Sequence, residues 1–305
     1  MNTIRRPSKY IKEEYILPPK GGLSPCPGCG MVLALRYFLK AIGEKVVFVS
    51  TAGCIMPTLL NPKCILEYKK EPIPSIFVPF GSPAICAGGL KSAFVARGDT
   101  ETEVVVWVGD GATFDIGLGG ISAAAERNED IIYVCYDNEA YMNTGNQRSS
   151  ATPRQVITTT THFPMLKREN KKDIMSIVAA HNVPYAATAT IAYPDDLMRK
   201  VQKAKGITGF RFFHILTPCV IGWQYPSQFT IKMSYLAVES KMFPLFEVEN
   251  GLTYTINKEP VGMPVDDFVK NQGRYKHLPS QDLTELQKRV DERWKRLCWL
   301  VHYEA

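Results

Sequence analysis

Apolar runs rich in β-branched residues alternate with helical patterns along most of the chain, and this alternation restricts the fold more than any other feature of the sequence. Strand-like and helix-like segments in turn are typical of a mostly parallel α/β sheet with helices on both faces. The runs are almost entirely apolar, as expected for strands that are covered on both sides. The predicted strands are 46–50, 75–80, 104–108, 131–136, 185–191 and 210–216. The predicted helices are 31–42, 84–96, 117–127, 172–181, 194–204, 229–242 and 281–300.

The alternation ends near residue 258, and the C-terminal part has a different pattern. Segment 258–278 has no regular period and predicts an extended arm, after which an amphipathic helix closes the chain. We therefore expect one α/β domain with an N-terminal cap over residues 1–257 and a C-terminal arm and helix over 258–305. A chain of 305 residues is long enough to bury a substantial core.

Charge and hydropathy argue against nucleic-acid and membrane binding. The net charge is +6, and no stretch clusters Lys and Arg in the manner of a nucleic-acid-binding tract. No apolar run reaches the roughly 20 residues that a membrane span needs. The N-terminal segment MNTIRRPSKYIKEEYILPP lacks the apolar core of a signal peptide, so a cytoplasmic protein is expected.

A GDG motif follows the predicted strand at 104–108. Its residues, Gly109, Asp110 and Gly111, stand at the carboxyl end of that strand and before a helix, where open α/β sheets bind ligands. The glycines allow the backbone to approach a ligand closely, and the N–H groups of the following helix face an anion. Asp110 offers a carboxylate oxygen of the kind that Mg²⁺ prefers.

A second oxygen ligand follows the next predicted strand. Asn138 stands 28 residues after Asp110, directly behind the run IIYVCYD. Because consecutive strands joined by one right-handed crossover usually lie side by side, Asp110 and Asn138 are expected to converge on one ion. A Mg²⁺ ion held there would also bind a diphosphate. GDG followed by this asparagine resembles the thiamine-diphosphate motif.

Eight cysteines in a chain without a secretion signal favour metal or redox chemistry over disulfides. Cys26 and Cys29 form a CPGC motif, whose two thiolates reach one centre from a single turn. Cys54 and Cys219 each follow a predicted strand, so they are expected at the same edge of the sheet. Four thiolates suit a [4Fe–4S] cluster or Zn²⁺, whereas a CPGC pair alone suits a thioredoxin-like redox site. The spacing leaves all three open.

The remaining cysteines are expected to be structural. Buried cysteine usually behaves as a small hydrophobic residue. This expectation covers Cys64, Cys86, Cys135 and Cys298.

Three motifs taken together, CPGCG, GDGATFDIG and DNEAYMNTGNQRSSATP, resemble the β subunit of pyruvate:ferredoxin oxidoreductase and its 2-oxoacid relatives. The similarity runs from about residue 21 to the end and includes TPCVIGW, PLFEVENG and NQGRYKHL. It implies a thiamine-diphosphate-binding fold with an N-terminal iron–sulfur cap. It also implies the oxidative decarboxylation of a small 2-oxoacid, pyruvate or oxalate, with electrons passed to ferredoxin.

The resemblance assigns roles to individual residues. Mg²⁺ would be bound by Asp110, the side chain of Asn138 and the backbone carbonyl of Ala140. Gly109, Gly111 and Thr144 would also contact the cofactor. Asn143 matches a catalytic asparagine beside the reacting thiazolium carbon, placed to hydrogen-bond the substrate. The ligands of a [4Fe–4S] cluster are matched by Cys26, Cys29, Cys54 and Cys219.

The same resemblance implies partners. These are subunits of the α, γ and δ types in one complex, ferredoxin, and coenzyme A where the acid leaves an acyl group. The glutamate that activates the cofactor in this family belongs to another subunit.

Two departures from the family pattern concern the substrate. Asn146 stands where an aliphatic residue is expected, and PFGSPAICAGG replaces a run of small apolar residues. More polar character favours a small charged acid such as oxalate. Two other functions remain as alternatives: a non-redox thiamine-diphosphate decarboxylase or synthase, which would need no cluster, and an iron–sulfur or zinc electron-transfer module, which would leave the GDG motif unused.

Overall fold

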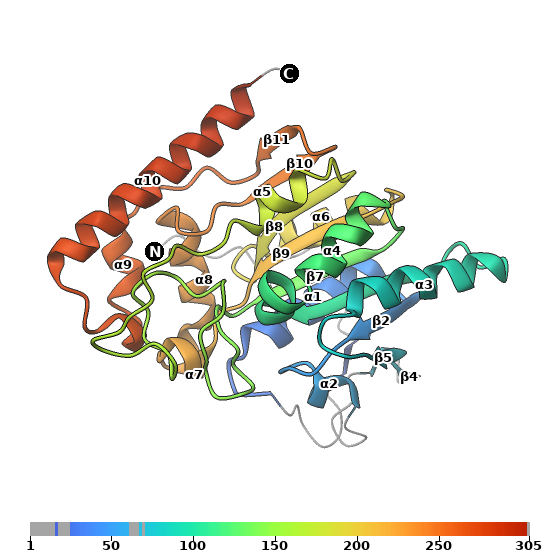
Figure 1. Ribbon diagram of the computed structural model, residues 1–305, viewed down its shortest axis with the longest axis horizontal. Coiled ribbons are helices and arrows are strands. Elements are labelled where there is room, and N and C mark those ends of the chain that lie inside the picture. Colours follow the sequence, from blue (N-terminus) through green and yellow to red (C-terminus); the bar gives the residue numbers. More distant parts are fainter. Residues whose placement is uncertain (1–15, 18–24, 61–66, 69–70, 304–305) are drawn as a thin grey trace.

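The computed structural model describes residues 16–17, 25–60, 67–68 and 71–303. Its centre is an eight-stranded sheet with the order β11-β10-β8-β9-β7-β6-β2-β5 (Figure 1). Its strands are β2 (Val46–Ser50), β5 (Ser75–Phe77), β6 (Glu103–Gly109), β7 (Ile132–Asp137), β8 (Tyr185–Thr190), β9 (Arg211–Leu216), β10 (Phe246–Glu249) and β11 (Thr253–Ile256). A separate three-stranded sheet has the order β1-β3-β4, formed by β1 (Ile16–Leu17), β3 (Glu67–Tyr68) and β4 (Glu71–Pro72).

The larger helices are the expected ones, with ends moved by a few residues. They are α1 (Gly30–Ile42), α3 (Pro83–Ala96), α4 (Leu118–Glu126), α5 (Ile174–Ala179), α6 (Pro194–Lys205), α8 (Thr230–Glu239) and α10 (Ser280–His302). Shorter turns of helix are α2 (Met56–Leu60), the π-helix η2 (Gly111–Ile116), α7 (Val220–Trp223), η3 (Ser227–Phe229), α9 (Val265–Val269) and η4 (Gly273–Tyr275).

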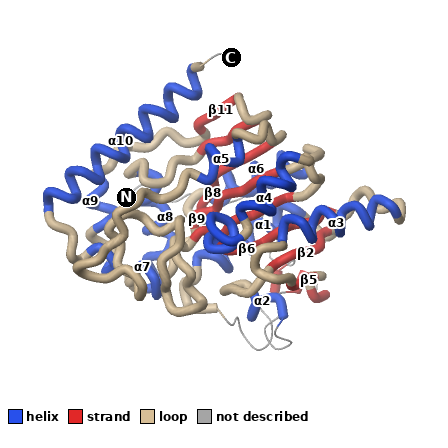
Figure 2. Tube along the Cα trace, viewed as in Figure 1, coloured by secondary structure: helices blue, strands red, loops and turns tan. Residues whose placement is uncertain are grey.

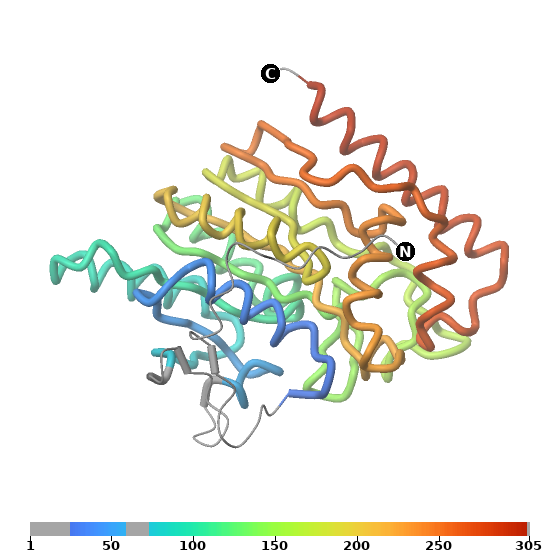
Figure 3. Tube along the Cα trace, turned by 180° about the vertical axis from the view of Figure 1, so that it is seen from behind, coloured from blue at the N-terminus to red at the C-terminus, as the bar shows by residue number. Residues whose placement is uncertain are grey.

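Helices cover both faces of the sheet, as predicted. Alternate residues of β6 point to opposite sides: Trp107 joins the core under α1 and α6, and Val106 joins the core under α3, α4 and α5. Figure 2 shows the strands enclosed between the helices, and Figure 3 shows α1 and α6 on the rear face. Phe38 of α1 meets the Trp107 ring edge-on at 5.2 Å between centroids. Each such buried aromatic side chain contributes about 1.5–3 kcal/mol of apolar burial.

The strand order reverses between β2 and β6. β2 pairs in parallel with both β5 and β6, and the chain runs outward to β5 before it returns to β6. From β6 the sheet continues in parallel through β7 and β9 to β8. At such a reversal the loops beyond the carboxyl ends of the two strands diverge and leave a crevice for a ligand. The loops in question carry Cys54 and Asp110.

The hairpin of β10 and β11 was not predicted. β10 pairs antiparallel with both β8 and β11, which makes the sheet mixed at one end. The sequence carried a signal for it in the pair Asn250-Gly251, which lies in the three-residue loop between Glu249 and Thr253 and has the positive φ, 51° and 71°, that hairpin turns require.

The C-terminal arm is less extended than expected. It contains α9 and the single turn η4 before α10 begins. α10 packs against α9 and β11 and runs along one end of the molecule (Figure 1). In the described part of the chain no helix is both long and apolar enough to span a membrane. Cys64 and most of the expected N-terminal cap, residues 1–15 and 18–24, lie outside the described residues.

Candidate active site

Asp110 begins the π-helix η2 directly after β6 and is 1% exposed. Its carboxylate accepts a hydrogen bond from the Ser149 hydroxyl. Burial raises the pKa of Asp110 well above its usual range, and the nearby Asp137 carboxylate raises it further. Among the described residues no Lys, Arg or His side chain forms an ion pair with Asp110. The site therefore holds a buried carboxylate without a direct counter-charge.

Asn138 and Ala140 follow the neighbouring strand β7. β6 and β7 pair in parallel with Gly109 opposite Tyr136, so Asp110 and Asn138 leave the sheet side by side, as predicted. The Asn138 side-chain oxygen accepts a hydrogen bond from the Ala140 N–H at 3.2 Å. Both residues are buried, and an amide oxygen keeps a second lone pair for a cation.

Glycine is required at position 111 by a close contact. A Cβ atom added to Gly111 would lie 2.2 Å from the Tyr141 ring. The Tyr141 hydroxyl donates to the Gly111 carbonyl at 3.3 Å and to Asp115 at 3.0 Å. At Gly109 an added Cβ would lie 3.3 Å from the Tyr136 ring, a milder restriction. Both glycines therefore let the loop after β7 pack closely on the GDG motif.

A buried group of charges lies beside Asp110. The Asp137 carboxylate pairs with Lys171 and accepts a hydrogen bond from His214 at 2.7 Å. Although burial opposes ionisation, these contacts hold the pKa of Asp137 at about 2. Lys171 also pairs with Glu139 at 2.8 Å, and both carboxylates hold its pKa above the usual value despite burial. Each of these charges has an oppositely charged partner, whereas the Asp110 carboxylate has none in direct contact.

Asn143 and Thr144 lie away from this buried group, at an exposed turn. The turn is closed by two backbone hydrogen bonds between Tyr141 and Gln147, of 2.8 and 3.1 Å. The Thr144 hydroxyl donates to the Tyr141 carbonyl at 3.3 Å. Asn146, at the same turn, has φ of 60°, a conformation that asparagine adopts more readily than aliphatic residues do. In the single chain Asn143 and Thr144 thus face solvent.

The CPGC turn docks on the segment that carries Cys219. The Gly30 N–H donates to the Pro218 carbonyl at 3.3 Å, and a Cβ added to Gly30 would lie 2.9 Å from Pro218. The Thr230 hydroxyl donates to the Gly28 carbonyl at 2.6 Å. The glycines of CPGCG therefore bring its two thiols up to the loop after β9.

Cys54 lies within electrostatic reach of the other three thiols and of Asp110. Burial raises the pKa of Cys54 to about 12, and Cys219, Cys29, Cys26 and Asp110 add to the increase in that order. Burial likewise raises the pKa of Cys219 to about 11. The thiols of Cys26, Cys29 and Cys219 and the Asp110 carboxylate therefore lie near enough to Cys54 to affect its ionisation, and their role as ligands of one centre stays a prediction.

Two of these thiols lie at helix N-termini. Cys29 precedes α1, and burial raises its pKa although the N–H groups of Val32 and Met31 oppose the increase. Cys219 precedes α7, and its sulfur accepts a hydrogen bond from the Gly222 N–H at 3.4 Å. Such N–H donors stabilise thiolates. Within the described segments no three His, Cys, Asp or Glu side chains stand close enough to hold a single metal ion.

The other described cysteines lie elsewhere. Cys135 is buried inside β7, Cys86 is in α3 and Cys298 is in α10.

Several residues of the site were not predicted. Ser149, Lys171, His214 and Arg274 contact or surround the two loops, yet each comes from a distant part of the sequence. Ser149 and Arg274 stand in the stretches that carried the family resemblance, which was the available signal.

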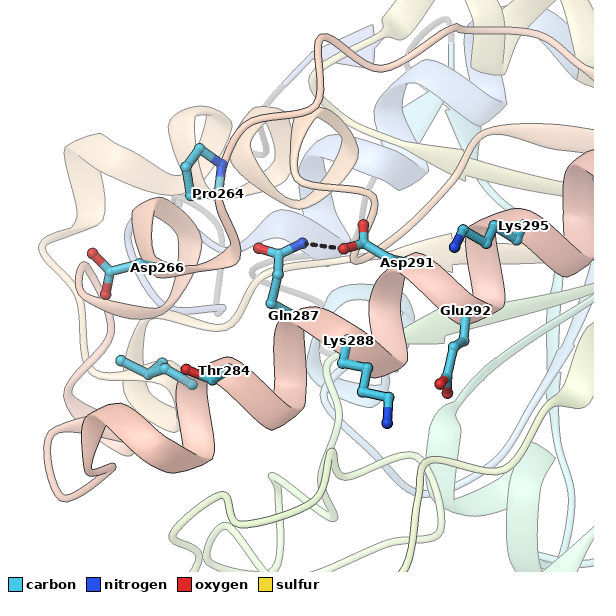
Figure 4. Close-up of a pocket in the computed structure, with 9 residues that line it drawn as sticks. Pro264, Asp266, Thr284, Gln287, Lys288, Asp291, Glu292 and Lys295 are labelled. Carbon is cyan, nitrogen blue, oxygen red and sulfur yellow. Dashed lines mark hydrogen bonds between the residues drawn. The ribbon is translucent and has the colours of Figure 1, made fainter.

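Two large hollows flank α10. One, of about 580 Å³, lies between α10 and the sheet, and Glu139, Lys171 and His214 are part of its lining. The other, of about 590 Å³, is a groove between α9 and α10 (Figure 4). Charged side chains border this groove: Lys288 and Glu292 point away from it, and Lys295 extends along α10 toward Asp291 (Figure 4). Neither hollow is lined by Asp110 or by any of the four cysteines.

Comparison with known proteins agrees with this geometry. The family described as "Thiamine pyrophosphate enzyme, C-terminal TPP binding domain" matches residues 67–215. Pyruvate synthase subunit PorB of Methanocaldococcus jannaschii is 41% identical over 299 residues, which cover 95% of this chain and 98% of that protein. Ketoisovalerate oxidoreductase subunit VorB of Pyrococcus furiosus is 43% identical, covering 94% of this chain and 96% of that protein.

A solved structure shares the fold. It is the 2-oxoglutarate:ferredoxin oxidoreductase from Magnetococcus marinus with 2-oxoglutarate, coenzyme A and succinyl-CoA bound. The TM-score is 0.59 at 18% identity, over 90% of this chain and 94% of that one. Taken with the sequence relatives, this places the chain in the family of thiamine-diphosphate-dependent 2-oxoacid:ferredoxin oxidoreductases, as a β subunit of the kind found in pyruvate synthase and ketoisovalerate oxidoreductase.

Proposed function

We propose that this β subunit binds thiamine diphosphate through Mg²⁺, ligates one [4Fe–4S] cluster, and serves the oxidative decarboxylation of a small 2-oxoacid with electrons passed to ferredoxin. The observation that carries the proposal is the position of Cys54 and Asp110 on either side of the β2–β6 reversal. A thiolate site and a carboxylate site adjoin there, as a cofactor that releases electrons next to an electron acceptor requires.

The residues at the GDG loop suit a magnesium diphosphate. Asp110 is a buried carboxylate without a counter-charge, and a divalent cation would supply one. Asn138 and the carbonyl of Ala140 would provide two neutral oxygens, and Gly109 and Gly111 allow the diphosphate to approach the backbone. When bound, thiamine diphosphate supplies a nucleophilic carbon and an electron sink for decarboxylation.

The cysteines suit an iron–sulfur cluster better than a single zinc ion. Cys26, Cys29, Cys54 and Cys219 influence one another electrostatically, yet no three of the described acidic, His or Cys side chains are close enough for one ion. A zinc site with Zn–S bonds of about 2.3 Å needs tightly grouped sulfurs. A cluster places iron and sulfide atoms between its thiolates, so it does not need its four sulfurs within bonding distance of one ion.

Asn143 and Thr144 are assigned to the part of the site that faces a partner. Both are exposed in the single chain, at the turn that follows the metal loop, which is the segment from Asn138 to Ala140 after β7. Asn143 would hydrogen-bond the substrate, and Thr144 would contact the cofactor. The activating glutamate would come from an α-type subunit, with γ- and δ-type subunits completing the complex.

The named relatives and Asn146 limit the choice of substrate. Relatives named for pyruvate and for ketoisovalerate favour a 2-oxoacid with a small side chain. Coenzyme A would then be the acyl acceptor. Because Asn146 is polar, oxalate is a further candidate substrate, and it has no acyl group to transfer. Pyruvate is our first candidate.

Turnover by the purified complex tests the proposal. Viologen reduction should require thiamine diphosphate, Mg²⁺ and one 2-oxoacid among pyruvate, ketoisovalerate and oxalate. Omission of coenzyme A should slow the reaction of the first two and leave oxalate unaffected. An iron-replete complex that reduces viologen with none of these acids would refute the substrate assignment, and turnover by the isolated chain would refute the divided site.

A further inference from the structure

Glu139 stands between the two proposed Mg²⁺ ligands that follow β7, and its backbone and its carboxylate both contact other parts of the protein. Its φ is 70°, a conformation that costs a residue with a side chain of order 1 kcal/mol or more. Its N–H donates to Asp137 at 2.9 Å, and its carbonyl accepts from the Thr152 hydroxyl at 2.7 Å. Its carboxylate pairs with Lys171 at 2.8 Å and Arg274 at 2.7 Å. The strained metal loop is thus fixed by residues outside it.

Arg274 reaches this loop from the C-terminal arm. It belongs to the motif NQGRYKHL, to which the proposed chemistry assigns no role. The side chain is 1% exposed, and its Nε donates to the Gln272 side chain at 2.8 Å. Its guanidinium lies 4.0 Å from the centroid of the Trp223 ring, within cation–π distance. One Arg274 side chain therefore contacts both Glu139 and Trp223.

Trp223 in turn connects the cysteine site with the metal loop. It ends α7, the helical turn that begins after Cys219, and its backbone N–H donates to the Cys219 carbonyl at 2.9 Å. Its indole N–H donates to the backbone carbonyl of Asn138, also at 2.9 Å. The turn that carries Cys219 and the loop that carries Asn138 are thus separated by a single buried tryptophan.

We propose that Trp223 and Arg274 are positioning residues that fix the metal loop against the Cys219 turn, so that the C-terminal arm controls how tightly Mg²⁺ and thiamine diphosphate are retained. The inference rests on the proposed function, because it takes Asn138 and Ala140 as Mg²⁺ ligands and Cys219 as a cluster ligand. Neither Trp223 nor Arg274 touches the reacting atoms.

Trp223→Phe gives the sharpest test, because it keeps an aromatic ring under Arg274 and removes only the hydrogen bond to Asn138. In the purified complex the Mg²⁺ concentration for half-maximal turnover should rise by roughly two- to tenfold, the range for one lost hydrogen bond. Saturating Mg²⁺ should restore kcat. The spin-resonance signal of the reduced cluster should change shape at unaltered iron content. Trp294→Phe in α10, far along the chain from both loops, is the matched control and should change none of these.

Arg274→Lys and Glu139→Gln test the second contact. Lysine keeps the charge but loses the planar contact with Trp223, and glutamine removes the charge that pairs with Arg274. Each variant should therefore raise the Mg²⁺ concentration for half-maximal turnover by roughly two- to tenfold. The double variant should weaken Mg²⁺ by less than the product of the two single effects, because the contact between Arg274 and Glu139 is common to both changes.

The outcomes separate the inference from the proposed function. In one outcome, Asp110→Asn abolishes Mg²⁺-dependent binding of thiamine diphosphate while Trp223→Phe and Arg274→Lys leave the Mg²⁺ requirement within twofold of the parent. In that case the inference is wrong and the proposed function stands. Equal losses of stability in Trp223→Phe and Trp294→Phe that excess Mg²⁺ does not reverse would also overturn it. If Asp110→Asn has no effect on binding, the proposed function itself fails.

Discussion

Cys54 and Asp110 follow the neighbouring parallel strands β2 and β6, and the loops that carry them leave the sheet on either side of the strand-order reversal. The two residues come from loops at neighbouring parallel strands, so the distance between them is set by the sheet and not by a flexible linker. A cluster and a diphosphate bound at these positions would be neighbours. Electrons could then leave the cofactor site over a short path.

Asp110→Asn should abolish the binding of thiamine diphosphate and leave the protein folded. Asparagine keeps the size of the side chain but removes the only carboxylate assigned to Mg²⁺. Because burial already disfavours ionised Asp110, the free energy of unfolding of the cofactor-free protein should stay within about 1 kcal/mol of the parent. Calorimetry with thiamine diphosphate and Mg²⁺ on the assembled complex measures the binding.

Asp115→Asn is the control for this substitution. Asp115 lies on the same π-helix and accepts from Tyr141 and from the Ser150 N–H, but it has no assigned role at the metal. Unchanged affinity in Asp110→Asn, or an equal loss in both variants, would remove Asp110 from the metal site.

Replacing any one of Cys26, Cys29, Cys54 and Cys219 by Ala should lower the iron content and alter the spin-resonance signal of the reduced protein. Each thiolate would be one of the four protein ligands of the cluster. Cys135→Ala and Cys298→Ala should keep full iron, because their thiols lie in β7 and α10. Full iron in Cys219→Ala would show that the fourth ligand lies elsewhere, and loss of iron in Cys64→Ala would identify it.

Gly111→Ala should destabilise the protein by about 1–3 kcal/mol, the usual cost of overpacking. The new methyl group would lie 2.2 Å from the Tyr141 ring. Gly119→Ala is a matched control: no atom lies within 4 Å of its added Cβ, and an alanine in α4 should stabilise by about 0.5–1 kcal/mol. Denaturant titration of both variants decides the point, and equal stability would mean that the Tyr141 contact is absent in solution.

The stability of the protein should gain a pH-dependent contribution from Lys167. Burial, together with a smaller contribution from the nearby Arg148, lowers the pKa of Lys167 from 10.5 to about 8. Between these values the unfolded chain holds the proton and the folded chain does not, so this contribution to stability rises with pH. Below about pH 8 both states are protonated, and the contribution is constant.

Lys167→Met removes this titration. The difference in unfolding free energy between parent and variant, followed from pH 7 to pH 9.5, should change in favour of the parent as pH rises. A difference that does not vary with pH would mean that Lys167 keeps its proton.

The parallel strands and their helices were predictable because fully covered strands leave long apolar runs. The side-by-side placement of Asp110 and Asn138 followed from the usual adjacency of consecutive strands, and the structure confirms it. The ligand roles of the site residues stay predictions. The π-helix η2 was not predicted, and the first helix after the GDG motif was expected to begin only at residue 117. The local sequence pattern does not reveal the i→i+5 hydrogen bonds of a π-helix.

The contacts around Glu139 could not be predicted, since their partners are far apart in the sequence. Lys171 and Arg274 carry no pattern that assigns them to one carboxylate. The exposure of Asn143 could not be predicted either, because it depends on how the turn between Tyr141 and Gln147 closes.

The hairpin at the end of the sheet bears on how this subunit avoids unwanted association. An uncovered edge strand offers a row of free N–H and C=O groups to any other strand, which is a common origin of aggregation. Here α10 packs across β11, and the opposite edge ends in β5, which has three residues. Both edges therefore offer little to a foreign strand, and partner subunits would bind through helix faces and loops and leave the sheet at its present width.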